Sequence, residues 1–376
     1  MGLLDYYKQF EDIDEEELNK ERRARRRREK DLALQHVPDL DLSNTEWPEF
    51  PNSEVMNASI YTARGRINGY PDRHAEGVRR VLAERHGVEP ERIVLGNGAA
   101  ELLQSAALAL LSEGDELVTP WPSYPLYPLM AARAGARPVP VDTGPNGRDL
   151  QPLLDAVTPR TRVLVLCNPN DPTGWYLDSA TVAGLLEALP DHVHVLLDEA
   201  LIHFQDVEEV DACLRLASDH PRLLAVRTFS KVYGLSGMRA GYAVASEDEA
   251  ELLDRIAPVL GVNALTQSAV SQALKIGGPE VERRRTSVIR ERRRLLEELR
   301  ELPVDVTPSE ANFIWMKAPE MTGSLLAARL RDAGVIVAPG GPLGADDHIR
   351  AAIRNSGATD RLLEGLRRAL ESEAAS

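Results

Sequence analysis

The sequence contains few cysteines and no long hydrophobic run. Its 376 residues include two cysteines, Cys167 and Cys213, too few for a disulfide framework and consistent with a reducing compartment. No stretch approaches the roughly 18 uncharged apolar residues that a membrane-spanning helix needs. The first residues become acidic at once and lack the basic start and apolar centre of a signal peptide. We therefore expect a cytoplasmic protein without a membrane partner.

A metal-binding pattern is absent as well. The eight histidines form no HExxH motif and no cluster with cysteine, which are the arrangements that bind zinc. His192 and His194 instead flank the start of an expected strand. We predict no metal site.

Positive charge is in deficit. Lysine and arginine together number 44 against 59 acidic residues, giving a net charge of -15, which argues against nucleic acid as the main partner. Residues 21–30, ERRARRRREK, are strongly basic and could contact nucleic acid. The surrounding sequence runs from acidic to basic, and Glu21 and Arg25 have the spacing of a pair across one helical turn. We favour a solvated helix.

Short apolar runs alternate with helical stretches from about residue 90. The expected strands are 92–96, 116–120, 162–167, 193–198 and 222–228, and the expected helices are 99–111, 124–135 and 179–189. This alternation predicts an α/β fold, a three-layer sandwich around a mostly parallel sheet with helices on both faces. Such sheets bind ligands beyond the carboxyl ends of their strands.

The pattern changes near residue 255. A charged helix over 288–302, strands over 311–317 and 348–354 and a helix over 358–373 follow. Two to two and a half domains of about 150 residues fit this length. We expect a charged helix and arm over 1–50 that joins a smaller α/β domain over 256–376, and a large domain over 51–255.

Three polar clusters follow three of the expected strands. Residues 168–174, NPNDPTG, form a turn-rich loop, Asp198 ends the next strand, and Thr228, Ser230 and Lys231 follow the third. Each cluster alone could cap a helix or face solvent. Together they place a carboxylate, hydroxyls and an amine at one crevice. A desolvated lysine can form a Schiff base with a carbonyl cofactor such as pyridoxal 5'-phosphate (PLP).

These motifs carry a resemblance to a known family. Residues 228–242, TFSKVYGLSGMRAGY, resemble the PLP attachment site of the fold-type I class I/II aminotransferases, and NPNDPTG and DEA are similar to the two motifs that precede it. The further stretches are INGYPD near 70, GNGAAEL near 98, PSYPLY near 124, EANFI near 312 and HIRAAI near 350. With them the chain looks most like the histidinol-phosphate aminotransferase branch. The resemblance implies an aspartate-aminotransferase-like fold.

The resemblance implies roles for the residues that contact the cofactor. Lys231 would form the Schiff base with PLP and move a proton between substrate and cofactor, and Asp198 would pair with the pyridine nitrogen. The groups that would hold the phosphate are Thr228, Ser230, Arg239 and the backbone amides of Ala99 and Ala100 at a helix start.

Four further residues acquire roles in the same way. Tyr124 would stack on the cofactor ring, although a tyrosine there could equally be packing. Tyr70 would reach the phosphate in the neighbouring subunit, which implies a homodimer. Arg350 would grip the anionic end of the substrate, since a guanidinium suits a carboxylate, although a surface charge is the alternative. Asn312 would also contact the substrate.

Two positions near the cofactor depart from the family pattern. Asp171 stands where asparagine is usual, and Leu201 where tyrosine is usual, so both expected donors to the phenolic oxygen are missing. An ionised Asp171 would repel a phenolate, whereas a protonated one could donate to it. A third possibility is that Asp171 points away and Tyr233, His203 or water substitutes for it.

The function that follows is a PLP-dependent aminotransferase. It would exchange an amino group between an amino acid, or an amino-alcohol phosphate such as histidinol phosphate, and a 2-oxo acid. Ala338 stands where the histidinol-phosphate branch has arginine, so an amino acid whose carboxylate meets Arg350 is an equal candidate. A PLP-dependent decarboxylase or lyase/cyclase is the alternative, and a non-catalytic nucleic-acid-binding regulator is a remote one.

Overall fold

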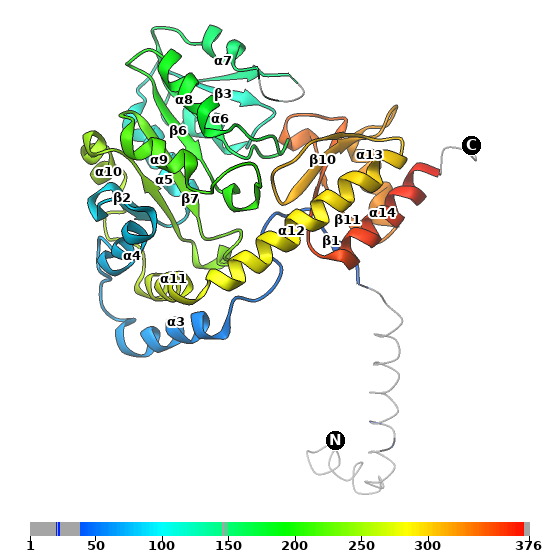
Figure 1. Ribbon diagram of the computed structural model, residues 1–376, viewed down its shortest axis with the longest axis horizontal. Coiled ribbons are helices and arrows are strands. Elements are labelled where there is room, and N and C mark those ends of the chain that lie inside the picture. The colour runs from blue at the N-terminus through cyan, green and yellow to red at the C-terminus, as the bar shows by residue number, and fades with distance from the viewer. Residues whose placement is uncertain (1–19, 21, 23–37, 145–146, 148, 372–376) are drawn as a thin grey trace, which may run out of the picture. The chain divides into compact units, whose positions relative to one another are not determined.

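The computed structural model describes residues 20, 22, 38–144, 147 and 149–371 (Figure 1). The chain divides into two compact units, Met1–Leu40 and Asp41–Ser376. The charged helix predicted around residues 21–30 lies outside the described residues, apart from Arg22.

A seven-stranded sheet with the order β2-β8-β7-β6-β5-β3-β4 forms the larger part of this unit. Its strands are β2 (Ile93–Gly96), β3 (Glu116–Trp121), β4 (Arg137–Asp142), β5 (Thr161–Cys167), β6 (His194–Asp198), β7 (Leu223–Thr228) and β8 (Gly241–Val244). Strand β8 is antiparallel to both of its neighbours, and the other pairings are parallel. Cys167 pairs with Asp198, and Asp198 with Val226, so β5, β6 and β7 end side by side.

Helices cover both faces of this sheet. One face carries α5 (Ala99–Leu110), α6 (Leu126–Arg133) and α10 (Ala250–Ile256), and the other carries α7 (Gln151–Asp155), α8 (Ser179–Ala188) and α9 (Ala212–Asp219). Along β5, Val163 and Val165 pack into the first core and Leu164 and Leu166 into the second, because successive side chains of a strand point to opposite faces. The predicted three-layer α/β fold is confirmed.

A second, antiparallel sheet has the order β12-β13-β10-β9. Its strands and covering elements are β9 (Asp305–Thr307), β10 (Phe313–Lys317), β12 (Ala338–Pro339), β13 (His348–Ala352), α13 (Gly323–Asp332), β11 (Val335–Ile336) and α14 (Ser356–Glu371). Leu42, directly after β1 (Leu40–Asp41), donates its amide to the Ile336 carbonyl at 2.7 Å and accepts from the Ala352 amide at 2.9 Å. Residues 41–46 are thereby tied to the smaller sheet region.

Four helices complete the unit. They are α3 (Ser53–Arg66), α4 (Glu76–His86), α11 (Ala264–Ile276) and α12 (Gly278–Glu298). Short 3-10 helices are η1 (Pro90–Arg92), η2 (Ile202–Phe204), η3 (Ser236–Met238), η4 (Glu247–Glu249), η5 (Leu299–Glu301) and η6 (Gly341–Leu343). Helix α11 packs on α3 and α4, and α12 runs from beside α11 to α14 (Figure 1). The domain limits at residues 50 and 255 stay a prediction. No helix among the described residues is both long and apolar enough to cross a membrane.

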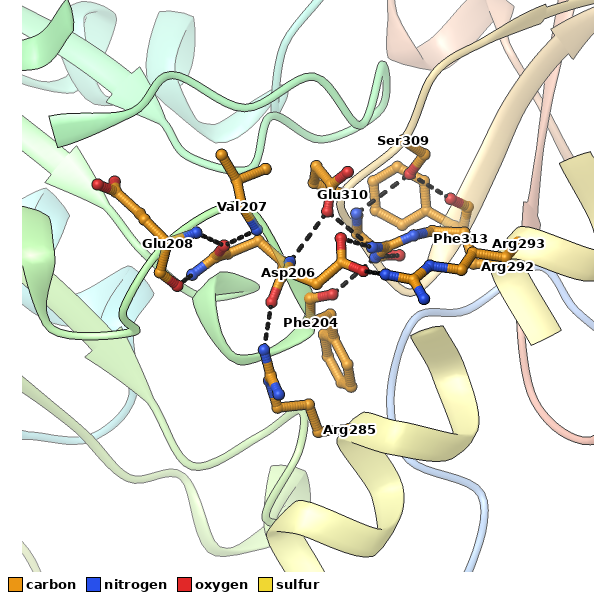
Figure 2. A network of polar contacts seen from close by, with 12 residues as sticks. Phe204, Asp206, Val207, Glu208, Arg285, Arg292, Arg293, Ser309, Glu310 and Phe313 are labelled. Atoms are coloured by element: carbon orange, nitrogen blue, oxygen red, sulfur yellow. Dashed lines mark hydrogen bonds and ion pairs between the residues drawn. The ribbon is translucent and has the colours of Figure 1, made fainter. Parts of the chain in front are cut away.

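Arg292 of α12 joins the two sheet regions through a buried polar network (Figure 2). Its side chain is 2% exposed and donates to the Phe204 carbonyl at 2.6 Å, to Asp206 at 3.1 Å and to Glu310 at 2.7 Å. The Asp206 amide also donates to Glu310 at 3.1 Å. One guanidinium thus connects the segment after η2, helix α12 and the loop before β10.

Replacing this arginine tests how much the junction contributes to stability. Arg292→Met should lower the free energy of unfolding by about 3 kcal/mol, because the Phe204 carbonyl and the partly buried carboxylates of Asp206 and Glu310 would all lose a donor. The neighbouring Arg293 also contacts Asp206 but its side chain is 72% exposed, so Arg293→Ala should cost less than about 1 kcal/mol. Urea unfolding of both variants measures the difference. Equal losses would contradict this account.

Candidate active site

A cavity of about 380 Å³ lies at the carboxyl ends of β5, β6 and β7. Ten of the twelve predicted site residues line it: Ala99, Ala100, Tyr124, Asp171, Asp198, Thr228, Ser230, Lys231, Arg239 and Arg350. The smaller sheet contributes Arg350, and the segment after β1 contributes Asn44, Thr45 and Glu46. Residues distant in sequence therefore meet at the edge that the strand pattern predicts.

Lys231 follows β7 and turns its amine into the cavity. Its Nζ donates to Thr45 Oγ1 at 2.5 Å. Burial lowers the pKa of the Lys231 amine, although the nearby Asp171 carboxylate acts in the opposite direction. An amine with a lowered pKa is more often in the neutral, nucleophilic form.

Asp198 ends β6 and is held from two sides. It accepts a hydrogen bond from Tyr127 Oη at 2.8 Å and another from the Ala200 amide at 3.0 Å. Burial raises the pKa of this carboxyl, and the Tyr127 hydrogen bond partly offsets the effect. A buried carboxylate of this kind can keep a protonated ring nitrogen close to it.

Hydroxyls, an arginine and a helix start form an anion-binding corner of the cavity. Thr228 Oγ1 donates to Ser230 Oγ at 2.9 Å, and Arg239 lies beside Gly98 at the start of α5. The φ of Gly98 is +97°, a backbone conformation that favours glycine, and its missing side chain leaves room for Arg239 Nη2. The first amides of a helix have no partner within it and attract anions. This corner has the donor set that a phosphate group needs.

Tyr124 offers an aromatic surface to the same cavity. Its side chain lies edge-on to Tyr127, with ring centroids 5.8 Å apart at 74°. Burial raises the pKa of the Tyr124 phenol, and the charge of Asp198 adds to the effect. The phenol therefore stays neutral and can pack against a flat ring.

Asp171 does not point away from the cavity. It forms an ion pair with Arg350, whose Nη1 donates to Asp171 Oδ1 at 2.5 Å. Tyr233 instead accepts a hydrogen bond from Arg85 and packs its ring on His203. Neither Tyr233 nor His203 is among the described residues that line the cavity, whereas the apolar Leu201 is.

Two predicted residues lie outside the cavity lining. Asn312 is buried just before β10, and its Nδ2 donates to the Thr45 carbonyl at 2.8 Å. It thus supports the segment that contacts Lys231. Tyr70 is 87% exposed and lines a separate groove beside α3 and α11. Ala338 pairs with Arg350 across β12 and β13 and adds no charge to the site.

Behind the cavity lies a second buried charge network. Glu199 follows Asp198 but accepts from Arg227 Nε at 2.8 Å. Arg227 Nη1 also donates to Asp211 at 2.6 Å, and His86 Nδ1 lies 2.9 Å from that carboxylate. Burial lowers the pKa of His86. None of these four residues is among the described residues that line the cavity, and Glu199 Oε1 is buried without a hydrogen-bond partner among the described groups.

Two residues that position the site were not predicted from the sequence. Tyr127 lies in the first turn of α6, and its amide donates to the carbonyl of Tyr124 just before the helix at 3.1 Å, so its nearness to the predicted Tyr124 could have been recognised. Thr45 has no comparable signal, because its partner Lys231 is 186 residues away. The described residues contain no group of three or more side chains that could hold a metal ion.

The comparisons with known proteins agree with this geometry. The family model of class I and II aminotransferases matches residues 38–369. The chain therefore belongs to the class I and II aminotransferase family, whose members depend on PLP, and it is an aminotransferase. The predicted family resemblance is confirmed.

Relatives with different printed activities match over most of their length. An aromatic amino acid aminotransferase of Cutibacterium acnes is 36% identical over 334 residues, covering 88% of this chain and 93% of that protein. A histidinol-phosphate aminotransferase of Carboxydothermus hydrogenoformans is 34% identical over 347 residues, with 91% and 94% covered.

Solved structures are similar in fold as well. A Thermus thermophilus aspartate aminotransferase mutant has a TM-score of 0.79 at 26% identity, covering 92% of this chain and 96% of that one. The histidinol-phosphate aminotransferase of Sinorhizobium meliloti, solved in complex with PLP, has a TM-score of 0.77 at 26% identity, with 89% and 91% covered. The predicted aspartate-aminotransferase-like fold is confirmed.

The burial of Lys231 makes a prediction about stability and pH. Since its pKa in the folded protein lies below the usual value of 10.5, the folded state binds fewer protons, and stability should rise with pH between those two values. Lys231→Met removes this dependence. The free energy of unfolding of Lys231→Met minus that of the wild type should therefore be largest at pH values below the lowered pKa. This difference should fall as the pH rises toward 10.5.

Urea unfolding of the cofactor-free protein at several alkaline pH values measures this trend. Lys275→Met makes the same change of side chain at an exposed amine on α11 and is the matched control. A difference between Lys231→Met and wild type that stays constant with pH would contradict the role of burial.

Proposed function

We propose that this chain binds PLP in the cavity and transfers an amino group between an amino acid and a 2-oxo acid. The observation that carries the proposal is the meeting of a buried amine, a buried carboxylate and an anion-binding corner in one cavity. These groups match the aldehyde, the ring nitrogen and the phosphate of PLP. When bound, PLP would supply a carbonyl for attachment and a ring that withdraws electrons from the substrate.

The chain's own residues would divide the remaining work. Lys231 would attach the cofactor and, once released, carry a proton to and from the substrate carbon. Asp198, fixed by Tyr127 and the Ala200 amide, would hold the proton on the ring nitrogen. Thr228, Ser230 and Arg239 would bind the phosphate.

The lining of the cavity favours a substrate with an uncharged side chain. Among the described residues, the cations that line it are Lys231, Arg239 and Arg350, and the first two are assigned to the cofactor. Of these three, Arg350 is left for an anionic group, and Ala338 provides no cation for a substrate phosphate. Together with relatives named as aromatic amino acid aminotransferases, this supports an aromatic amino acid as donor over histidinol phosphate.

A homodimer is part of the proposal. Tyr61 of α3, Ile67 and Tyr70 are 80%, 73% and 87% exposed, and apolar side chains gathered this way often mark an interface. Val259 and Leu260, 79% and 61% exposed, belong to a loop whose Gly261 contacts the Arg73 backbone near Tyr70. We propose that this surface meets a second copy and that Tyr70 reaches the partner's cavity.

Absorption spectroscopy tests the proposed reaction. The purified protein with PLP should show the band of an attached cofactor, and phenylalanine should convert it to the amine form with release of phenylpyruvate. Lys231→Ala should show no such attachment. A band that persists while the substrate loses carbon dioxide would replace transamination with decarboxylation, and the absence of any band would refute cofactor binding.

Mixing two inactive variants tests the shared site. If Tyr70 serves the partner's cavity, Tyr70→Ala and Lys231→Ala subunits should each have little activity alone. Dissociated and reassembled in equal amounts, they should recover about a quarter of wild-type activity, because half of the symmetric dimers would be mixed and each would have one intact site. Sedimentation measures the assembly. No recovery from confirmed mixed dimers would place Tyr70 outside the partner's site.

A further inference from the structure

The guanidinium of Arg350 is already occupied by groups of the chain itself. Nη1 donates to Asp171 Oδ1 at 2.5 Å, and Nη2 donates to the Ser43 carbonyl at 3.1 Å. Nε is buried and has no hydrogen-bond partner among the described residues. The Phe313 ring lies beneath the guanidinium, 5.5 Å from ring centroid to Cζ. A ligand in the cavity therefore meets a guanidinium on which Nη1 and Nη2 each already donate one hydrogen bond, out of the five N–H groups of the arginine.

Among the cations of the described cavity lining, Arg350 is the one left for a substrate. The charged side chains in that part of the lining are Glu46, Asp171, Asp198, Lys231, Arg239 and Arg350. Under the proposed function, Lys231, Arg239 and Asp198 serve the cofactor. What then faces the substrate is one guanidinium, a carboxylate in contact with it, and Glu46.

A substrate carboxylate would have to compete with Asp171. Bidentate binding of a carboxylate needs two N–H groups in one plane. Nη1 of Arg350 already donates to the carboxylate of Asp171. The side chains of Arg350 and Asp171 are each 11% exposed, so a displaced Asp171 would keep a desolvated charge without its partner. Exchanging the Asp171 carboxylate for that of the substrate contributes little binding free energy. Leaving Asp171 buried without its partner is unfavourable.

We propose that Asp171 determines substrate specificity by competing with the substrate carboxylate for Arg350. The inference rests on the proposed function for its substrates. Asp171 weakens the binding of amino acids and leaves the binding of amines without a neighbouring carboxylate, such as amino alcohols, unaffected. Asparagine at this position would keep the shape and a neutral oxygen for Arg350 but would remove the competing charge.

Equilibrium binding to the full-length protein tests the competition directly. The probes are 3-phenylpropionate, which has a carboxylate and no amine, and the neutral 3-phenylpropan-1-ol. Calorimetry is carried out on the cofactor-free and the PLP-loaded protein, with excess inorganic phosphate in the cofactor-free samples to fill the anion-binding corner. Asp171→Asn should lower the Kd of the acid about tenfold or more, while the Kd of the alcohol stays within about twofold.

Glu46→Gln is the matched control, because it removes a carboxylate from the same cavity with no hydrogen bond or ion pair to Arg350 among the described contacts of that guanidinium. It should change the Kd of the acid much less than Asp171→Asn does. Adding Arg350→Gln to Asp171→Asn should abolish the gain. An unchanged Kd in Asp171→Asn, or an equal gain in Glu46→Gln, would overturn the proposal.

Kinetics provide a second measurement. The ratio of kcat/KM for phenylalanine to that for phenylalaninol should rise in Asp171→Asn, and the change should lie in the KM for phenylalanine. An unchanged ratio would also count against the proposal. If Asp171→Asn binds 3-phenylpropionate more tightly but the wild-type protein transfers no amino group, the proposed function is refuted and this inference still stands.

Discussion

The structure depends on the burial of charge at the carboxyl ends of three parallel strands. Strands β5, β6 and β7 are covered on both faces, so any polar group at their ends loses most of its water and needs a partner from the protein. Asp198 accepts hydrogen bonds from Tyr127 and from a backbone amide, and Lys231 donates one to Thr45. The surrounding loops and the segment after β1 are arranged around these requirements.

The same constraint separates two networks that begin at adjacent residues. Asp198 and Glu199 are neighbours in the chain. Asp198 lines the cavity, whereas Glu199 accepts a hydrogen bond from Arg227 and is not among the described residues of the lining. Arg227 pairs with Glu199 and Asp211, which are not among the described residues that line the cavity. Burial is the largest cause of the pKa shifts of both Asp198 and Lys231. This explains how one strand end can carry both a functional carboxylate and a structural one.

The alternation of strands and helices predicted the larger sheet well, because buried parallel strands need continuous apolar runs and helical connections. The residues that end these strands were also predictable, since their place in the sheet follows from the strand order. Thr45 and the pairing of Asp171 with Arg350 were not, because both depend on how the smaller sheet region meets the larger one. Nothing in the local sequence around Thr45 or Asp171 encodes a partner about 180 residues away.

The segment after β1 contributes to the site through its main chain as well as through the Thr45 side chain. Arg350 binds the carbonyl of Ser43, and Asn312 binds the carbonyl of Thr45. A carbonyl is present whatever side chain a residue bears. Substitutions at Ser43 can therefore keep the hydrogen-bond acceptor that Arg350 uses. At Ser43, the position of the main chain therefore matters more to Arg350 than the identity of the side chain.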